Sequence, residues 1–272
     1  MIRTTLLPGY VDLHTHILPA LDDGPADLDT SIALVRAAAA GGSGVLVATS
    51  HSEEVLQHGG GGTAMAARLD EVRQAVALAG INVSLLLGSE IYLEPDTPAR
   101  LRRQELLPLN GSRYVLVELP FQALPIYVDQ TLFALQTEGY VPVIAHPERN
   151  AQVQREPEKL YTWVTHGALV QLSAISLLGG LGRAAARVCR LAITHHLCHA
   201  IASDAHDPLT RPPALQPAFV RLRDEFGPAV AQALLDDQPR AIVEDRPLDL
   251  PEPLPIEANS DGNVFWRLFG RG

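Results

Sequence analysis

The hydrophobic and polar positions of the chain form short apolar runs separated by longer amphipathic stretches. Apolar Val11 and Leu13 alternate with Asp12, His14 and His16, and this period of two is typical of a β-strand. The later apolar runs lack polar alternation, as expected for strands buried on both faces of a parallel sheet. They lie at residues 44–49, 81–87, 114–117, 141–145, 169–172 and 200–202. The pattern therefore predicts about seven strands.

The stretches between these strands have helical periodicity and helix end signals. The first helix begins with Asp27 and Asp29 and stops at Gly41, and acidic first turns and terminal glycines are both favoured in helices. Strands that alternate with helices predict an α/β fold with parallel strands, either an open sheet or a barrel. Further helices are predicted at residues 63–78, 128–138, 157–166, 182–194, 213–226 and 229–236, with a short one near 98–101.

Composition supports a folded chain with one distinct terminal segment. The 272 residues are 47% hydrophobic and 19% charged, so the chain can bury a substantial core. We expect one domain over residues 1–246, followed by a proline-rich C-terminal tail over residues 247–272 that is flexible. The tail ends in an aromatic cluster, Phe265 to Phe269, which either docks on the domain or contacts a partner.

Charge and cysteine content exclude several classes of protein. A net charge of −10 argues against nucleic acid as a partner, whereas bound cations could still make the site attractive to an anionic substrate. Cys189 and Cys198 match no zinc or redox motif, which favours reduced thiols. No signal peptide or apolar run of roughly 18 residues is present. We therefore expect a soluble, cytoplasmic protein that is not inserted into a membrane.

Most of the predicted strands end in a histidine or a carboxylate. The carboxyl ends of parallel strands meet on one face, so residues scattered over two hundred positions would converge there. Asp22 and Asp23 would arrive on the loop after the first strand. The sequence therefore predicts a shared metal site, with candidates His14, His16, His51, Glu90, Glu118, His146, Asp204 and His206.

The candidate ligands are too many for a single ion. With one of the two aspartates they number five histidines and four carboxylates, whereas a catalytic zinc needs three protein ligands. They suit two or three ions that share bridging carboxylates, and imidazole with carboxylate fits manganese, iron or zinc. The other five histidines are expected to have ordinary roles, in a glycine-rich loop, at helix C-termini or at the start of a strand: His58, His166, His195, His196 and His199.

The candidate ligands lie in short sequence runs at residues 12–16 (DLHTH), 22–24 (DDG), 49–51 (TSH), 88–92 (GSEIY), 117–118 (VE), 145–149 (AHPER) and 202–206 (ASDAH). These runs resemble the PHP (polymerase and histidinol phosphatase) superfamily in matching order over about residues 10–245. Within it, the motifs at 18–25, 88–92 and 211–213 resemble the bacterial CpsB/CapC-type protein-tyrosine phosphatases. Those proteins dephosphorylate the tyrosine kinases of capsular and exopolysaccharide synthesis.

The resemblance implies a distorted (β/α)7 barrel with a three-ion cluster, for which we expect Mn²⁺, with Fe or Zn as alternatives. His14, His16 and Asp204 would hold the first ion, and Glu90 would bridge to the second. Asp23, rather than Asp22, and His206 would serve the third. The remaining members of the cluster would be His51, Glu118 and His146.

Outside the ligand set, two arginines are candidates for catalysis. Arg149 and Arg211 follow His146 and His206 closely, and a guanidinium can bind phosphate oxygens in bidentate fashion. Asp12, on the first strand, is expected to orient an imidazole.

The resulting hypothesis is a metal-dependent phosphatase that acts on a tyrosine-phosphorylated protein, such as a bacterial tyrosine kinase. One alternative is a phosphatase of histidinol phosphate or another small molecule, which would use the same metals. Another is a non-catalytic metal-binding scaffold, which the full ligand set disfavours. A nuclease is disfavoured by the net charge.

Overall fold

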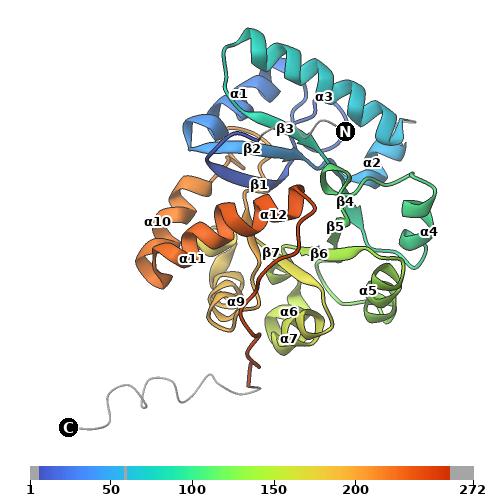
Figure 1. Ribbon diagram of the computed structural model, residues 1–272, viewed down its shortest axis with the longest axis vertical. Helices are drawn as coiled ribbons and strands as arrows, with labels where there is room; N and C mark the ends of the chain where they lie inside the picture. Colours follow the sequence, from blue (N-terminus) through green and yellow to red (C-terminus); the bar gives the residue numbers. More distant parts are fainter. Residues whose placement is uncertain (1–5, 58–59, 258–272) are drawn as a thin grey trace.

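The strands of the computed structural model are parallel and form two neighbouring sheets (Figure 1). The structure describes residues 6–57 and 60–257 of the chain. All seven predicted strands are present, and one further short strand, β4, lies between the third and the fourth of them. The strands are β1 (Tyr10–Thr15), β2 (Ser43–Ala48), β3 (Ser84–Leu87), β4 (Glu90–Tyr92), β5 (Tyr114–Glu118), β6 (Val141–Ala145), β7 (Leu169–Ser173) and β8 (Ala200–Ala202).

Helices connect successive strands, as the alternating pattern predicts, except between β3 and β4, which only Gly88 and Ser89 separate. The α-helices are α1 (Leu28–Ala40), α2 (Ser52–Gln57), α3 (Gly61–Leu78), α4 (Thr97–Arg102), α5 (Val128–Thr137), α6 (Ala151–Arg155), α7 (Glu158–Thr165), α8 (Ala174–Leu177), α9 (Gly182–Thr194), α10 (Leu215–Phe226), α11 (Pro228–Gln232) and α12 (Gln238–Val243). The described residues also form two short 3₁₀ helices, η1 (Leu109–Gly111) and η2 (Pro147–Arg149), and one π-helical turn, η3 (Ala233–Asp237). The sequence patterns missed α2, α6, α8 and α12.

The two sheets, β1-β2-β3 and β4 to β8, meet at two seams. At one seam, the chain leaves β3 of the first sheet, passes through Gly88 and Ser89, and continues as β4 of the second sheet, so the two short strands count as one position in the strand order. Glu90 N, at the start of β4, donates a hydrogen bond to Thr49 O over 3.2 Å. At the other, His16 N donates to Ala205 O over 2.8 Å. The arrangement is the expected α/β fold, with seven strand positions linked at the seams by isolated bridges.

Three apolar clusters build the core. The central cluster is formed by side chains from strands of both sheets that point toward one another, such as Val45 and Val47 of β2 and Leu116 of β5. Ile242 and Val243 of α12 join this central cluster, and Asn110 before β5 donates to Val243 O. Helix α12 therefore closes the amino end of the strands. The other two clusters lie between the strands and the outer helices.

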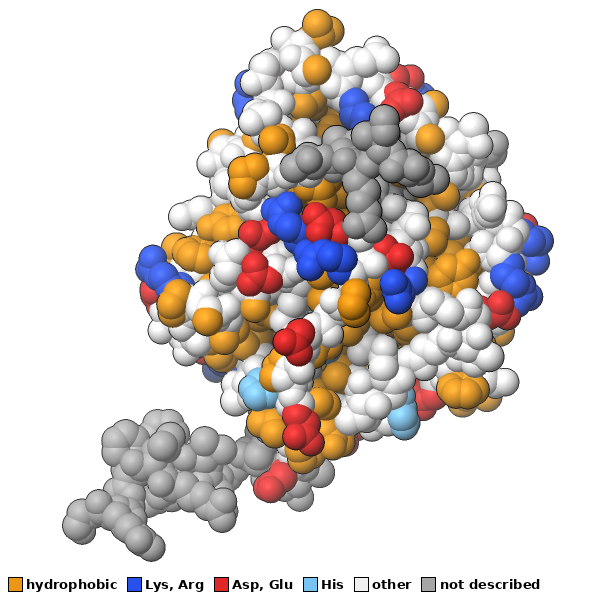
Figure 2. Space-filling model, in the orientation of Figure 1, with side chains coloured by type: hydrophobic (Ala, Val, Ile, Leu, Met, Phe, Trp, Pro, Cys, Tyr) orange, Lys and Arg blue, Asp and Glu red, His pale blue; other side chains and the backbone are white. Residues whose placement is uncertain are grey.

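The face over α12 carries mixed charges (Figure 2). Arg113 pairs with Asp245, and Arg240 pairs with Asp236. Among residues 6–57 and 60–257, no helix is long and apolar enough to cross a membrane.

The described part of the C-terminal segment, residues 247–257, has no helix or strand. It runs along the domain: Leu254 N donates to His195 O over 2.9 Å, and Ile256 is only 6% exposed. The aromatic cluster from Phe265 to Phe269 lies outside the described residues.

Candidate metal centre

The nine residues predicted as metal ligands lie at the carboxyl ends of the strands or in the loops that follow, opposite α12. The backbone is unusual at two of them, since His146 and Asp204 have φ values of 31° and 53°. This left-handed conformation costs a residue other than glycine of the order of 1 kcal/mol or more. It turns both side chains toward the site immediately after β6 and β8.

The structure brings all nine side chains together. Four overlapping groups each place their ligand atoms within 4.8 Å of one another, and together they contain every predicted ligand and no other residue. The groups are His16, Asp23, His51 and His206; His14, Glu90 and His146; His14, His16 and Asp204; and His51, Glu90 and Glu118.

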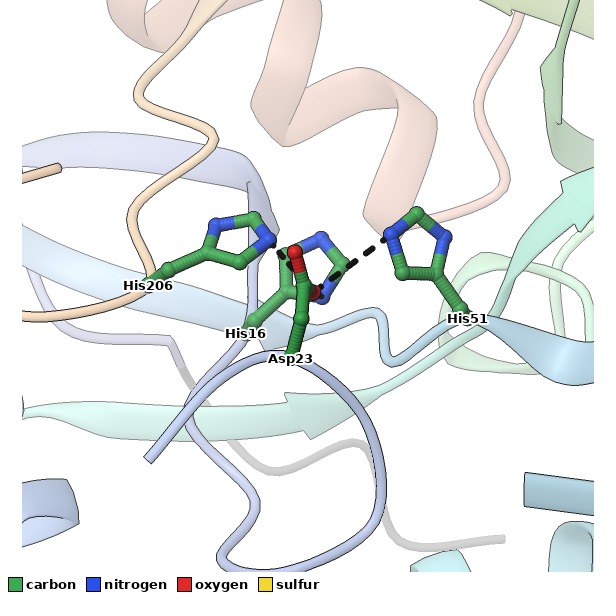
Figure 3. Close-up of side chains that lie close together, drawn as sticks. All are labelled: His16, Asp23, His51 and His206. Carbon is green, nitrogen blue, oxygen red and sulfur yellow. Dashed lines mark ion pairs between the residues drawn. The ribbon is translucent and has the colours of Figure 1, made fainter. Parts of the chain in front are cut away.

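Asp23 lies between two imidazoles at the more exposed edge of the cluster (Figure 3). Its Oδ1 is 2.9 Å from His206 Nε2 and 3.6 Å from His51 Nε2, while the His16 ring stacks on His206 with centroids 3.8 Å apart. Asp22 has a different position: its side chain is buried and accepts hydrogen bonds from His51 N and Gly24 N. The two neighbouring aspartates therefore have separate roles, and Asp23 is the one placed among the possible ligands.

The two histidines of the first strand have their protons directed away from the cluster. His14 Nδ1 is 3.1 Å from Gln171 Oε1, and His16 Nδ1 is 2.8 Å from Asp22 Oδ2. Because both oxygens accept hydrogen bonds, the proton of each neutral imidazole belongs on Nδ1, and this tautomer leaves the lone pair of Nε2 free. These two Nε2 atoms are 3.2 Å apart. Lone pairs facing each other at this distance repel, so the arrangement fits a cation between them.

Glu90 provides the strongest indication that the site fits metal ions. Its Oε2 is buried without a hydrogen bond, although His14 Nε2 and His51 Nδ1 each lie 3.1 Å away. Nearby, burial and then the negative charge of Glu90 raise the pKa of Glu118 above its ordinary value. Buried carboxylates this close repel each other when ionised, and divalent cations would remove that repulsion.

Two arginines stand beside the cluster and converge on one oxygen. Arg149 Nη1 is 2.6 Å and Arg211 Nη2 is 2.9 Å from Asp204 Oδ2, and Arg211 Nη1 is also 3.3 Å from Asp23 Oδ2. Both arginines line a cavity of about 340 Å³ that reaches Glu90, His146 and Asp204. Because the guanidiniums meet at a single atom, both could reach one anionic group that enters the cavity.

One sequence expectation is wrong and one residue was missed. Asp12 orients no imidazole: its Oδ1 accepts from Ser203 N over 2.9 Å, which ties β1 to the segment after β8. Gln171 of β7 orients His14 instead. A buried amide in an otherwise apolar strand was the available signal, because it breaks the pattern of the Val170–Leu172 run.

The other histidines that the structure describes lie outside the four groups. His166 and His195 cap the C-termini of α7 and α9, and His196 follows directly, as expected. His199 is buried beside β7, where its Nδ1 accepts a hydrogen bond from Val170 N. His58 lies outside the described residues.

Comparison with known proteins places this geometry in a family. The family model for CpsB/CapC proteins of capsular polysaccharide synthesis matches residues 10–244. The chain is 35% identical to the tyrosine-protein phosphatase YwqE of Bacillus subtilis, over 84% of this chain and 89% of that protein. It is 27% identical to the tyrosine-protein phosphatase CpsB of Streptococcus pneumoniae, over 87% and 99% of the two chains.

The fold agrees with the same relatives. A chain from the crystal structures of YwqE from Bacillus subtilis and CpsB from Streptococcus pneumoniae, which are metal-dependent tyrosine phosphatases, superposes with a TM-score of 0.86 at 33% identity. The superposition covers 91% of this chain and 99% of that one. The expected distorted barrel of the PHP type is thereby confirmed. The chain belongs to the CpsB/CapC family of capsular polysaccharide synthesis proteins.

Proposed function

We propose that the protein is a metal-dependent protein-tyrosine phosphatase. The observation that carries this proposal is a pair of arginines converging beside nine clustered metal-ligand side chains in one cavity. Similarity to the tyrosine-protein phosphatases YwqE and CpsB supports the same reaction. We propose a tyrosine-phosphorylated bacterial kinase of capsule or exopolysaccharide synthesis as the substrate.

Metal ions at this cluster would supply the reactive chemistry. The residues that would hold them are the nine side chains of the four groups. When bound, divalent ions neutralise phosphate oxygens and lower the pKa of water towards about 7, so that a nucleophile is available at neutral pH. We propose three ions, with Mn²⁺ as the native metal, because imidazole and carboxylate ligands without thiolate suit it.

The protein's own residues would bind and orient the phosphate. Arg149 and Arg211 would exchange their shared contact with Asp204 for the non-bridging oxygens of the phosphoryl group. Their two positive charges would stabilise the charge that accumulates on these oxygens in the transition state. A departing tyrosine phenolate, with a pKa near 10, needs less protonation than an alkoxide, so a dedicated general acid is not required.

We propose that the protein is located in the cytoplasm. Cys189 and Cys198 are both free and buried, as is usual for cysteines in a reducing compartment.

The proposal is tested by removing the metal and then restoring it. Chelation followed by dialysis should reduce hydrolysis of a phosphotyrosine peptide to about 1% or less, since metal activation supplies most of the barrier reduction. Adding Mn²⁺ should restore turnover, and parallel additions of Fe²⁺ and Zn²⁺ would rank the metals. Hydrolysis that continues at its full rate after complete metal removal would contradict the mechanism. Anomalous scattering from crystals grown with Mn²⁺ should locate three ions.

A further inference from the structure

Phe121 is an aromatic side chain at the wall of the polar cavity. It follows β5 by three residues, is 44% exposed and lines the same cavity as Arg149 and Arg211. Exposing a large apolar ring to water forgoes the gain from burying it, so a partly exposed ring in a cavity suggests a contact with a ligand.

The ring is placed in direct relation to the phosphate-binding residues. The guanidinium carbon of Arg149 lies 4.8 Å from the centroid of the Phe121 ring, a cation–π distance. The ring also lies 6.1 Å from the His146 ring, at an interplanar angle of 27°. Phe121 therefore borders both the arginine that would bind phosphate and a member of the metal cluster.

The backbone around Phe121 is held by hydrogen bonds to residues 150–152. Ala151 N donates to Phe121 O over 2.7 Å, and the side-chain amide of Asn150 donates to Pro120 O. Leu124 N, three residues further along the chain, donates to Gln152 Oε1 over 3.0 Å. Because these anchors follow directly after η2, the loop keeps its position relative to Arg149, and the ring is held ready before a ligand arrives.

We propose that Phe121 is a specificity residue that packs against the aromatic ring of the phosphorylated tyrosine. This inference rests on the proposed phosphotyrosine phosphatase function and identifies what would make the site prefer aryl over alkyl phosphates. A phosphoryl group bound by Arg149 would bring the ester-linked ring into the part of the cavity that Phe121 lines, and aromatic rings attract each other at centroid separations of roughly 4.5–7 Å. Tyr92, which also lines the cavity, adds a second aromatic wall.

The test separates contact with the ring from contact with the phosphate. Phe121→Ala should raise the KM for a phosphotyrosine peptide by about 3- to 10-fold, the size expected for one aromatic contact. The inhibition constant of inorganic phosphate, which has no ring, should stay within about 2-fold. Phe121→Tyr should restore the KM, because it keeps the aromatic face. Phe133→Ala, on the exposed side of α5, is the matched control.

Each other outcome has a distinct meaning. If Phe121→Ala raises the inhibition constant of inorganic phosphate as much as the KM for the peptide, Phe121 acts by positioning Arg149 and the proposed ring contact is wrong. If neither constant changes, Phe121 does not contact the substrate. A wild-type protein loaded with metal but inactive on phosphotyrosine would overturn the proposed function itself, and this inference with it.

Discussion

Asp204 connects the phosphate-binding residues to the metal cluster. Its Oδ2 accepts from Arg149 and Arg211, while its Oδ1 lies 3.5 Å from His14 Nε2 and 3.7 Å from His16 Nε2. One carboxylate therefore holds the arginines in place on one side and faces the imidazoles on the other. The arginines are positioned before substrate arrives, which avoids a loss of side-chain entropy at binding.

Removing Arg149 should impair turnover without emptying the site. Arg149→Ala should lower kcat/KM for a phosphotyrosine peptide by about 100-fold or more, the scale seen when one donor to a developing anion is lost. Arg149→Lys should recover part of this, since it keeps the charge but not the forked geometry. Metal content, measured by atomic emission, should not change, because Arg149 is in none of the four ligand groups.

An exposed arginine provides the matched control for Arg149. Arg223 of α10 pairs with Asp224 at the surface, and Arg223→Ala should leave both turnover and metal content unaltered. Loss of bound metal in Arg149→Ala alone would reassign Arg149 to the architecture of the cluster.

At the scale of single residues, the sequence predicts ligand types better than it predicts the partners that orient them. Histidines and carboxylates at strand ends could be identified because parallel strands bring their carboxyl ends together. Gln171 stands out in the sequence as a polar residue in an apolar run, but its partner cannot be identified there, since it depends on which side chain of another strand lies opposite. The prediction that Asp12 orients an imidazole assumed a regular strand, in which Asp12 and His14 point the same way. The pairing of β1 with β2 shifts between Asp12 and Thr15, and such irregularities change the direction of side chains.

At the scale of elements, β8 is a short strand that depends on a buried histidine. It has three residues, and His199 immediately before it donates its N–H to Val170 O and accepts from Val170 N at its ring. Burial lowers the pKa of His199 to about 4, against an ordinary value of 6.5. The folded protein thus holds this imidazole neutral in the interval where the unfolded chain protonates it.

Stability should therefore fall on acidification through His199. Between pH 6.5 and 4 the unfolded chain binds a proton that the folded chain does not, so the free energy of unfolding decreases as the pH falls. Between pH 7 and pH 5 the contribution of His199 is about 2 kcal/mol. His199→Asn keeps an acceptor for Val170 N but cannot titrate. Its free energy of unfolding, measured by urea denaturation, should therefore decrease less than that of the wild type between pH 7 and pH 5, by about this amount.

A surface histidine serves as the control for this pH effect. His166 is exposed at the end of α7, and His166→Asn should keep the wild-type loss of stability between pH 7 and pH 5. An equal loss in His199→Asn and in the wild type would show that His199 does not titrate in this way.

The elements missed by the sequence patterns are the short ones. Helix α12 has six residues, too few for a clear apolar period, and its position is fixed by packing of Ile242 and Val243 on the central cluster. The break at Gly88–Ser89 lets the chain pair first with β2 and then with β5, a change of partner that apolar periodicity cannot express. Tertiary packing, rather than local propensity, decides both features.

At the scale of the whole molecule, the two ends of the strands have opposite chemistry. α12 closes the amino end with apolar side chains, and the carboxyl end carries the ligand cluster and the cavity. The loops that surround the cavity also expose apolar residues: Ile126 after β5 is fully exposed, and Leu209 after β8 is 88% exposed. Because the same loops carry Phe121 and Arg211 of the cavity, the two exposed side chains would form an apolar rim for a polypeptide substrate, which a small, charged metabolite would not need.

This rim predicts how the protein should distinguish a phosphoprotein from a small phosphate ester. Wild-type kcat/KM should be higher for a tyrosine-phosphorylated kinase tail than for free phosphotyrosine, and higher than for histidinol phosphate. Ile126→Asp and Leu209→Asp should each lower the value for the tail by about 3- to 10-fold, since each removes one apolar contact. Free phosphotyrosine, which is too small to reach the rim, should be hydrolysed as before.

Leu78→Asp is the matched control, because Leu78 is equally exposed but lies at the end of α3, outside the loops that follow β5 and β8. It should leave turnover of both substrates unchanged. A tail that is hydrolysed no better than free phosphotyrosine, and that is insensitive to both rim variants, would favour the small-molecule phosphatase. The rim would then have no part in substrate choice, and selectivity would have to come from the cavity alone, where Phe121, Arg149 and Arg211 lie.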